Sequence, residues 1–180
     1  MFEVLRISSN TYCDYNSLGF TLFLRKRLDV IIQKLKDGIN IFNIDTDVLL
    51  FEKEEFFAQQ LIPPMDIIAQ REHSNMFCFG FMVIKSNPKT IEYFAEIAKI
   101  MNKDIKLHDQ KVGNEIYKKF NINVGLFSTQ DVTSYGLISG GKQWNGEAFE
   151  VPKCKAFHAN YTVGLRNKNI LLAKAKAKNG

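Results

Sequence analysis

One stretch constrains this chain more than any other: an apolar run that leads directly into two aspartates one residue apart. The run Ile39-Asn-Ile-Phe-Asn-Ile44 is rich in β-branched and aromatic residues, which favours a strand covered on both faces. Asp45 and Asp47 follow it. Two buried carboxylates this close repel each other unless a cation lies between them, and hard oxygen ligands favour Mg²⁺ or Mn²⁺. The stretch therefore predicts a strand that brings a metal site to a sheet edge; the alternative is a solvated turn.

Hydrophobic periodicity predicts helices that alternate with buried strands along the rest of the chain. Apolar residues at i, i+3 and i+4 spacing predict a helix from Phe20 to Leu35. Further helices are predicted at 52–57, at 90–101 after Asn87-Pro88, at 109–117 with Asp109 as N-cap, and over about ten Lys- and Ala-rich residues at the C-terminus; strands are predicted at 2–7, 66–70, 76–85, 122–127 and 154–159. Such alternation is typical of an α/β fold with a mostly parallel sheet, which binds ligands beyond the carboxyl ends of its strands.

Length and charge narrow the classes of protein to consider. With 180 residues we expect a single domain over 1–180, with a basic tail at about 169–180. The segment after Glu150 has seven basic residues and no acidic one, while the whole chain has a net charge of +5. No aromatic interleaving or groove-reading motif accompanies these lysines, so we expect no nucleic-acid partner.

Apolar runs and cysteines indicate the compartment. The longest apolar run, at 76–84 with a glycine inside it, is shorter than the ~20 residues of a membrane-spanning helix. No signal peptide is visible at the first methionine. The three cysteines are odd in number and lack metal-ligand spacing, which favours reduced thiols. We therefore expect a cytoplasmic protein without a transmembrane segment.

Several single residues also carry expectations. Gly80 interrupts a predicted strand, a position that usually marks a bulge or a close approach of the backbone to another group. Lys26 and Arg27 lie on the first predicted helix, where solvated surface charge is the expected role and contact with an anionic ligand the alternative. His73 and His108 have no partner pattern, and we expect them at the surface.

Four short motifs, taken together and in this order, resemble the nucleotide-diphospho-sugar transferase family. They are Asp45-Thr-Asp47, Gly80-Phe-Met-Val-Ile-Lys-Ser86, Asp109-Gln110 with Asn114, and His158-Ala-Asn-Tyr-Thr-Val-Gly-Leu-Arg-Asn-Lys168. Their order and approximate spacing hold from about Phe20 to the end of the chain. The resemblance implies a GT-A (Rossmann-like) fold and a retaining glycosyltransferase. Its donor would be a nucleotide-diphosphate sugar, UDP-linked above all, and its acceptor a glycan, a protein or a small molecule.

The resemblance also implies roles for individual residues. Asp45 and Asp47 would hold Mn²⁺, or Mg²⁺, against the diphosphate, and His158 would complete the metal shell. Gly164 and Lys168 would approach the diphosphate, and Gly80 would approach the donor. Asp109 and Gln110 would act beside the donor sugar, with Asn114 as the trailing asparagine of their motif, and Asn75 would replace a sugar contact because Cys78 stands where the family has asparagine. A metal and a lysine at the leaving diphosphate stabilise charge that develops in the transition state. A carboxylate or amide oxygen near the sugar supports its oxocarbenium-like character.

One departure from the family and two alternatives complete the expectations. Only 44 residues precede Asp45, so the N-terminal part of the nucleotide-binding half is expected to be short or missing. Either the chain is a truncated or fragmentary family member, or an oligomer or a partner chain completes the nucleotide site, or the base is held loosely. A haloacid dehalogenase-like phosphohydrolase would use Asp45 as nucleophile and Asp47 as acid and base. That class also needs a downstream Gly-Asp-x-x-x-Asp, which this sequence lacks. The other alternative is a degenerate transferase domain that binds nucleotide sugar or a protein partner without turnover.

Overall fold

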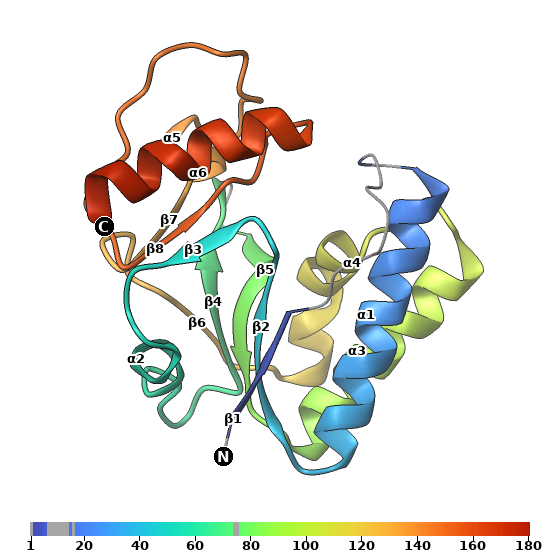
Figure 1. The fold of residues 1–180 in the computed structure, drawn as a ribbon. Helices are drawn as coiled ribbons and strands as arrows, with labels where there is room; N and C mark the ends of the chain where they lie inside the picture. Colours follow the sequence, from blue (N-terminus) through green and yellow to red (C-terminus); the bar gives the residue numbers. More distant parts are fainter. Residues whose placement is uncertain (1, 7–14, 16, 74–75) are drawn as a thin grey trace.

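The computed structural model describes residues 2–6, 15, 17–73 and 76–180, which form two sheets with helices around them (Figure 1). In chain order the elements are β1 (Phe2–Leu5), α1 (Leu18–Lys36), β2 (Asn40–Ile44), β3 (Val48–Leu50), α2 (Glu54–Ala58), β4 (Ile67–Arg71), β5 (Phe77–Ile84), α3 (Pro88–Lys103), α4 (Asp109–Ile116), the 3₁₀ helix η2 (Tyr117–Phe120), β6 (Val124–Leu126), β7 (Val132–Ser134), α5 (Tyr135–Ile138), β8 (Ala156–His158) and α6 (Leu165–Asn179). Each helix and strand predicted from the sequence has a counterpart here, whereas β3, β7 and α5 were not predicted.

The larger sheet has the strand order β1-β2-β5-β4-β6. Strand β1 is parallel to β2, and β4 is parallel to β6. Strand β5 is antiparallel to both of its neighbours, β2 and β4. Four of the five strands therefore run in one direction, so the predicted mostly parallel sheet is confirmed.

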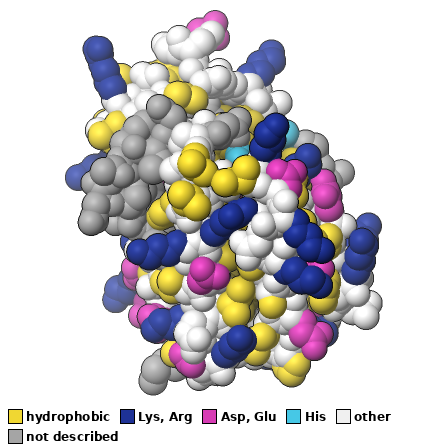
Figure 2. Space-filling model, turned by 90° about the vertical axis from the view of Figure 1, so that its right-hand side faces the viewer, with side chains coloured by type: hydrophobic (Ala, Val, Ile, Leu, Met, Phe, Trp, Pro, Cys, Tyr) yellow, Lys and Arg dark blue, Asp and Glu magenta, His cyan; other side chains and the backbone are white. Residues whose placement is uncertain are grey.

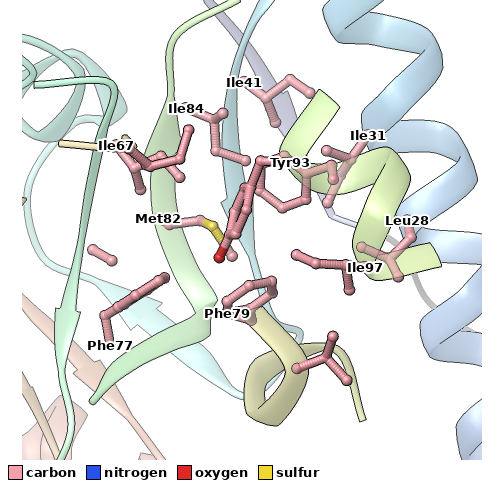
Figure 3. Close-up of a cluster of buried hydrophobic side chains, with 14 of the residues drawn as sticks. Leu28, Ile31, Ile41, Ile67, Phe77, Phe79, Met82, Ile84, Tyr93 and Ile97 are labelled. Atoms are coloured by element: carbon pink, nitrogen blue, oxygen red, sulfur yellow. The ribbon is translucent and has the colours of Figure 1, made fainter. Parts of the chain in front are cut away.

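Helices α1, α3 and α4 lie together on one side of this sheet (Figure 1). Their apolar side chains and those of the strands form a buried cluster that includes Leu28 and Ile31 from α1, Tyr93 and Ile97 from α3, and Met82 from β5 (Figure 3). Burying one such side chain contributes about 1.5–3 kcal/mol. Figure 2 looks onto this helical side, where the described basic and acidic side chains are interspersed rather than gathered by sign.

The smaller sheet has the order β3-β8-β7, with β3 antiparallel and β7 parallel to β8. A second buried cluster joins it to the larger sheet, because Phe42 and Phe81 of the larger sheet share this cluster with Val132 and Ala156 of the smaller one. The Phe42 and Phe81 rings meet edge to face with their centroids 5.1 Å apart, a favoured geometry for aromatic pairs. The two sheets are thus packed through a continuous apolar layer.

The basic C-terminal segment forms most of α6. This helix buries Leu171 and Ala175 completely in a third apolar cluster. Its last helical residue, Asn179, accepts a hydrogen bond from the Cys154 backbone N–H at 2.9 Å. The segment expected as a basic tail is therefore packed onto the smaller sheet, and the start of α6 lies near the strand ends.

Two helix starts were predicted, and one prediction was wrong. At α3, Asn87 caps the helix with a reciprocal Thr90 capping box, and Pro88 occupies the first turn as expected. At α4, the N-cap residue is His108 and Asp109 is the first helical residue, so the predicted N-cap role of Asp109 does not hold. The carboxylate of Asp109 is held by an arginine from α1 instead.

Candidate functional site

Two aspartates and one histidine converge where the larger sheet meets the smaller one. Asp45 directly follows β2, Asp47 lies in the turn before β3, and His158 ends β8. Pairing of β3 with β8 sets Val48 opposite His158, which brings the histidine beside the aspartate turn. One ligand atom from each of the three residues lies within 4.8 Å of the other two. The structure thus brings together the three residues predicted as metal ligands.

Distances within this cluster fit a small cation. His158 Nε2 is 3.2 Å from Asp47 Oδ1 and 3.9 Å from Asp45 Oδ2. Two carboxylate oxygens and an imidazole nitrogen form a donor set suited to Mn²⁺ and related divalent ions.

Backbone hydrogen bonds hold the turn that contains the two aspartates. The Asp45 N–H donates to the Gly80 carbonyl at 2.7 Å, and the Ala159 N–H donates to the Asp47 carbonyl at 3.0 Å. The ligand-bearing turn is therefore anchored to both sheets.

Two basic side chains pair with the carboxylate oxygens that face away from His158. Arg27 Nη1 lies 2.5 Å from Asp45 Oδ1, and Lys168 Nζ lies 2.5 Å from Asp47 Oδ2. Burial alone would raise the pKa of Asp47, but the charges of His158 and Lys168 hold that pKa well below its usual range. Burial would likewise lower the pKa of His158, but the adjacent Asp47 and Asp45 raise it above its ordinary value. A basic side chain thus lies beside each of the two aspartates.

Gly80 lies at the closest approach of β5 to this cluster. A Cβ at this position would meet Asp45 Oδ2 at 2.2 Å and His158 Cε1 at 2.9 Å. The pairing of β4 with β5 also shifts register between Ala69 and Arg71, as a bulge does. The prediction that Gly80 marks a bulge and a close backbone approach is confirmed.

Arg27 was expected at the surface but lies inside the site. Its side chain is buried, with Nη1 on Asp45 and Nη2 on Asp109 Oδ2 at 2.6 Å. Burial opposes its charge, yet Asp109 and Asp45 raise its pKa above the ordinary value, so it stays protonated. The expected role as solvated surface charge is therefore wrong. The available signal was its position on the apolar stripe of α1, four residues before the buried Ile31.

Helix α4 connects its predicted residues to the site in two ways. Asp109 is buried and reaches the metal cluster through Arg27. Gln110 Oε1 accepts the Phe79 backbone N–H at 3.0 Å, and Asn114 both accepts from the Phe77 N–H at 3.0 Å and donates to the Phe77 carbonyl at 2.9 Å. Gln110 and Asn114 therefore hold β5 in place directly before Gly80.

Of the remaining residues that the sequence singled out, one lies at the start of α6 and three lie elsewhere in the chain. Gly164 is the N-cap of α6 with φ +88°, a conformation that favours glycine, and its carbonyl accepts the Lys168 backbone N–H at 3.1 Å. Asn75 lies outside the described residues. His73 and His108 were expected at the surface but are half-buried. His73 Nε2 lies 2.9 Å from the Tyr161 hydroxyl.

A buried polar group behind His158 was not predicted from the sequence. Gln70 Oε1 lies 3.0 Å from His158 Nδ1. Glu72 Oε1 accepts a hydrogen bond from Asn160 Nδ2 at 2.8 Å, and Asn160 Oδ1 accepts the Gly136 N–H at 2.8 Å. Cys78 Sγ lies 3.9 Å from His158 Nδ1, and burial, followed by the nearby carboxylates of Glu72 and Asp45, raises the pKa of its thiol. These contacts tie the end of β4 to the segment after β8.

The described part of the chain has no helix that combines the length and the apolar character needed to cross a membrane.

Comparison with known proteins identifies the family. The family model of nucleotide-diphospho-sugar transferases matches residues 3–172. No protein with curated annotation gives a significant match. Among solved structures, a glycosyltransferase involved in the glycosylation of the major capsid of PBCV-1 is similar, with a TM-score of 0.59 and 10% identity over 85% of this chain and 77% of that chain. Mouse xyloside xylosyltransferase 1, in its apo form, has a TM-score of 0.47 and 13% identity over 82% of this chain and 67% of that chain.

At 10% identity the likeness to the PBCV-1 glycosyltransferase shows a shared fold alone. The family match covers most of the chain, including all the described site residues from Arg27 to Lys168. It overturns the phosphohydrolase alternative. The chain therefore belongs to the nucleotide-diphospho-sugar transferase family.

Proposed function

We propose that this protein is a metal-dependent glycosyltransferase that moves a hexosyl or pentosyl group from a nucleoside diphosphate sugar, UDP-linked above all, to an acceptor. One observation carries the proposal: Asp45, Asp47 and His158 converge at the carboxyl end of β2, with a basic residue beside each aspartate. In sheets of this kind ligands bind at the carboxyl ends of the strands. A cluster that combines a cation site with a partly exposed lysine is suited to a diphosphate.

Asp45, Asp47 and His158 would hold the divalent ion, Mn²⁺ or Mg²⁺. Bound there, the ion supplies positive charge that stabilises the diphosphate as it leaves the sugar. Lys168 is the more exposed of the two basic partners, with 29% of its side chain accessible, against 6% for Arg27. We infer that Lys168 exchanges Asp47 for a diphosphate oxygen when the donor binds.

Asp109 and Gln110 are proposed to act on the sugar side of the donor. Arg27 fixes the position of Asp109, because it is the ion-pair partner of that buried carboxylate. The Gln110 side-chain oxygen is bound to the β5 backbone, which fixes its side chain at the edge of the site. A fixed carboxylate near the anomeric carbon stabilises positive charge that develops there. Retention of the anomeric configuration is part of this proposal and rests on the resemblance to retaining members of the family.

The proposal is tested by assaying donor turnover. UDP-, GDP- and CMP-linked sugars are incubated with the chain and Mn²⁺, Mg²⁺ or EDTA, with mixed glycans as acceptors, and nucleotide release is measured. We expect turnover with one UDP-sugar and Mn²⁺, lost with EDTA and reduced at least about 100-fold in Asp47→Asn. The control is Asp37→Asn, because Asp37 is an exposed carboxylate at the end of α1. ¹H NMR of the first product reports the anomeric configuration.

Three other outcomes would change the proposal. Turnover that is unaffected by EDTA and by Asp47→Asn would contradict the metal-dependent mechanism. Metal-dependent UDP binding without turnover would favour the alternative of a binding module. Nucleotide affinity that rises with protein concentration would show that a second copy of the chain completes the nucleotide site.

A further inference from the structure

His158 lies between two kinds of partner that use its two ring nitrogens differently. Nε2 faces Asp47 Oδ1 at 3.2 Å and Asp45 Oδ2 at 3.9 Å, on the side of the candidate metal site. Nδ1 faces the amide oxygen of Gln70 at 3.0 Å. Gln70 belongs to β4 of the larger sheet and His158 to β8 of the smaller one, and both are buried. We propose that Gln70 is a positioning residue that keeps the proton of His158 on Nδ1 and so leaves Nε2 free to bind a divalent ion.

The chemistry of imidazole makes this contact matter. A neutral imidazole carries one N–H, and only the other nitrogen has a lone pair for a metal. An amide oxygen accepts hydrogen bonds and cannot donate them, so Gln70 Oε1 stabilises the tautomer with hydrogen on Nδ1. In that tautomer the Nε2 lone pair is available to an ion that replaces the second ring proton, on the side where the two aspartates lie. A metal-binding histidine is commonly oriented in this way by a partner on its second nitrogen.

Gln70 is an unfavourable residue for the stability of the folded protein at this buried position, so its contact with His158 is the better explanation for its presence there. Its Nε2 is buried and has no hydrogen-bond partner among the described residues, which is an unfavourable state for an amide. A second group near Nδ1 is the Cys78 sulfur at 3.9 Å, a weak acceptor. Of these two groups near His158 Nδ1, Gln70 Oε1 is therefore the stronger hydrogen-bond acceptor.

The inference rests on the proposed function, because it assumes that His158 binds a metal ion through Nε2. The test measures Mn²⁺ affinity of the full chain without nucleotide, from the EPR signal of free Mn²⁺. Gln70→Leu removes the acceptor at similar volume, and we expect Mn²⁺ binding about 10- to 100-fold weaker. Gln70→Glu keeps an acceptor oxygen, and we expect affinity within about threefold of wild type. Far-UV circular dichroism and urea unfolding check that each variant is folded.

Gln60→Leu is the matched control. Gln60 follows the end of α2 and also has a buried side-chain nitrogen without a hydrogen-bond partner among the described residues. Its removal deletes a similar amide outside the metal cluster, and Mn²⁺ affinity should stay at the wild-type value. Equal weakening in Gln70→Leu and Gln70→Glu would show that packing, and not the acceptor, matters, and would overturn the inference.

A second measurement uses the wild-type chain and does not depend on any variant folding. Zn²⁺ serves as a diamagnetic probe, and a long-range ¹H–¹⁵N spectrum reports which nitrogen of His158 carries hydrogen. We expect hydrogen on Nδ1 and the metal on Nε2; hydrogen on Nε2 would overturn the inference. If the wild type binds no Mn²⁺, the proposed metal site fails and the inference with it. If the wild type and Gln70→Leu bind Mn²⁺ equally, the inference alone fails.

Discussion

Gly80 shows how tightly single residues are constrained around the cluster. An added methyl group would lie 2.2 Å from Asp45 Oδ2, so Gly80→Ala must displace the aspartate or the strand. We expect Mn²⁺ binding at least about tenfold weaker and unfolding easier by about 1–3 kcal/mol from overpacking. Gly125→Ala is the control, because the three atoms nearest to its methyl group would all belong to the flexible Met65 side chain. It should change urea unfolding but not the Mn²⁺ titration. A Gly80→Ala chain with wild-type Mn²⁺ affinity would place the metal elsewhere.

Lys168 leads to a prediction in which two affinities change in opposite directions. Its ammonium group competes with a cation for Asp47. We expect Lys168→Met to bind Mn²⁺ alone about 10- to 30-fold more tightly, since the repulsion between a unit charge and a doubly charged ion about 4 Å apart is worth about 2 kcal/mol in water. The same variant should bind UDP with Mn²⁺ more weakly, because the diphosphate loses a partner. Calorimetric titrations measure both affinities.

The matched control for Lys168 is Lys174→Met on the same helix, where the ammonium lies over the Trp144 and Phe149 rings, 5.9 and 5.4 Å from their centroids. It should change neither affinity. If Lys168→Met weakened Mn²⁺ and UDP together, Lys168 would be needed to hold Asp47 in its binding position, and its proposed exchange between partners would be wrong.

At the residue scale, the sequence indicated the three candidate ligands but not the residues that support them, and the metal-binding role of the three stays a prediction. Asp45, Asp47 and His158 belong to recognisable motifs, and the structure brings them together. Gln70 could not be predicted, because its partner His158 is 88 residues away and their contact depends on how the two sheets pack. Arg27 was within reach, since a charged residue on an apolar helical stripe requires a buried partner.

Asp66 connects the start of β4 to the start of α3 and to the segment before β6 by hydrogen bonds. This buried carboxylate precedes β4 and accepts hydrogen bonds from Asn87 at the start of α3, from Lys89 at 2.7 Å and from the Asn123 N–H at 3.0 Å. Burial would raise its pKa, but the hydrogen bonds from Asn123, Lys89 and Asn87 lower it below the ordinary value. We expect Asp66→Asn to lower the free energy of unfolding by about 1–3 kcal/mol at pH 7.

The pH dependence of Asp66→Asn follows from the direction of that shift. A carboxyl whose pKa is lower in the folded state contributes stability above its unfolded pKa of about 3.9, and this contribution is lost as pH falls through the folded pKa. The difference in urea unfolding between wild type and Asp66→Asn should therefore shrink below about pH 4. Glu96→Gln removes an exposed ion pair with Lys99 within α3 and should change stability by less than about 0.5 kcal/mol. A difference independent of pH would mean that the Asp66 charge is not involved.

At the element scale, length decides what the sequence reveals. Helices α1 and α3 and strand β5 are long enough to show a hydrophobic period, and their predicted positions were confirmed within a few residues. Strands β3 and β7 have three residues each and α5 has four, too few for a period to appear. The sequence therefore predicted β8 of the smaller sheet but not its two neighbours, β3 and β7, and so did not predict the sheet itself.

At the scale of the whole molecule, the prediction of a single domain can be tested by asking whether the chain unfolds in one cooperative transition. The metal cluster draws Asp45 from the larger sheet and His158 from the smaller one, and a shared apolar cluster joins the two sheets. We therefore expect the chain to unfold as one unit. Mn²⁺ at about 100 times its dissociation constant should slow hydrogen exchange about 100-fold for core amides that exchange only on global unfolding. Ile97 in α3 should then slow as much as Leu171 in α6, and neither should slow in Asp47→Asn. Slowing at Leu171 alone would show that the smaller sheet and α6 open separately.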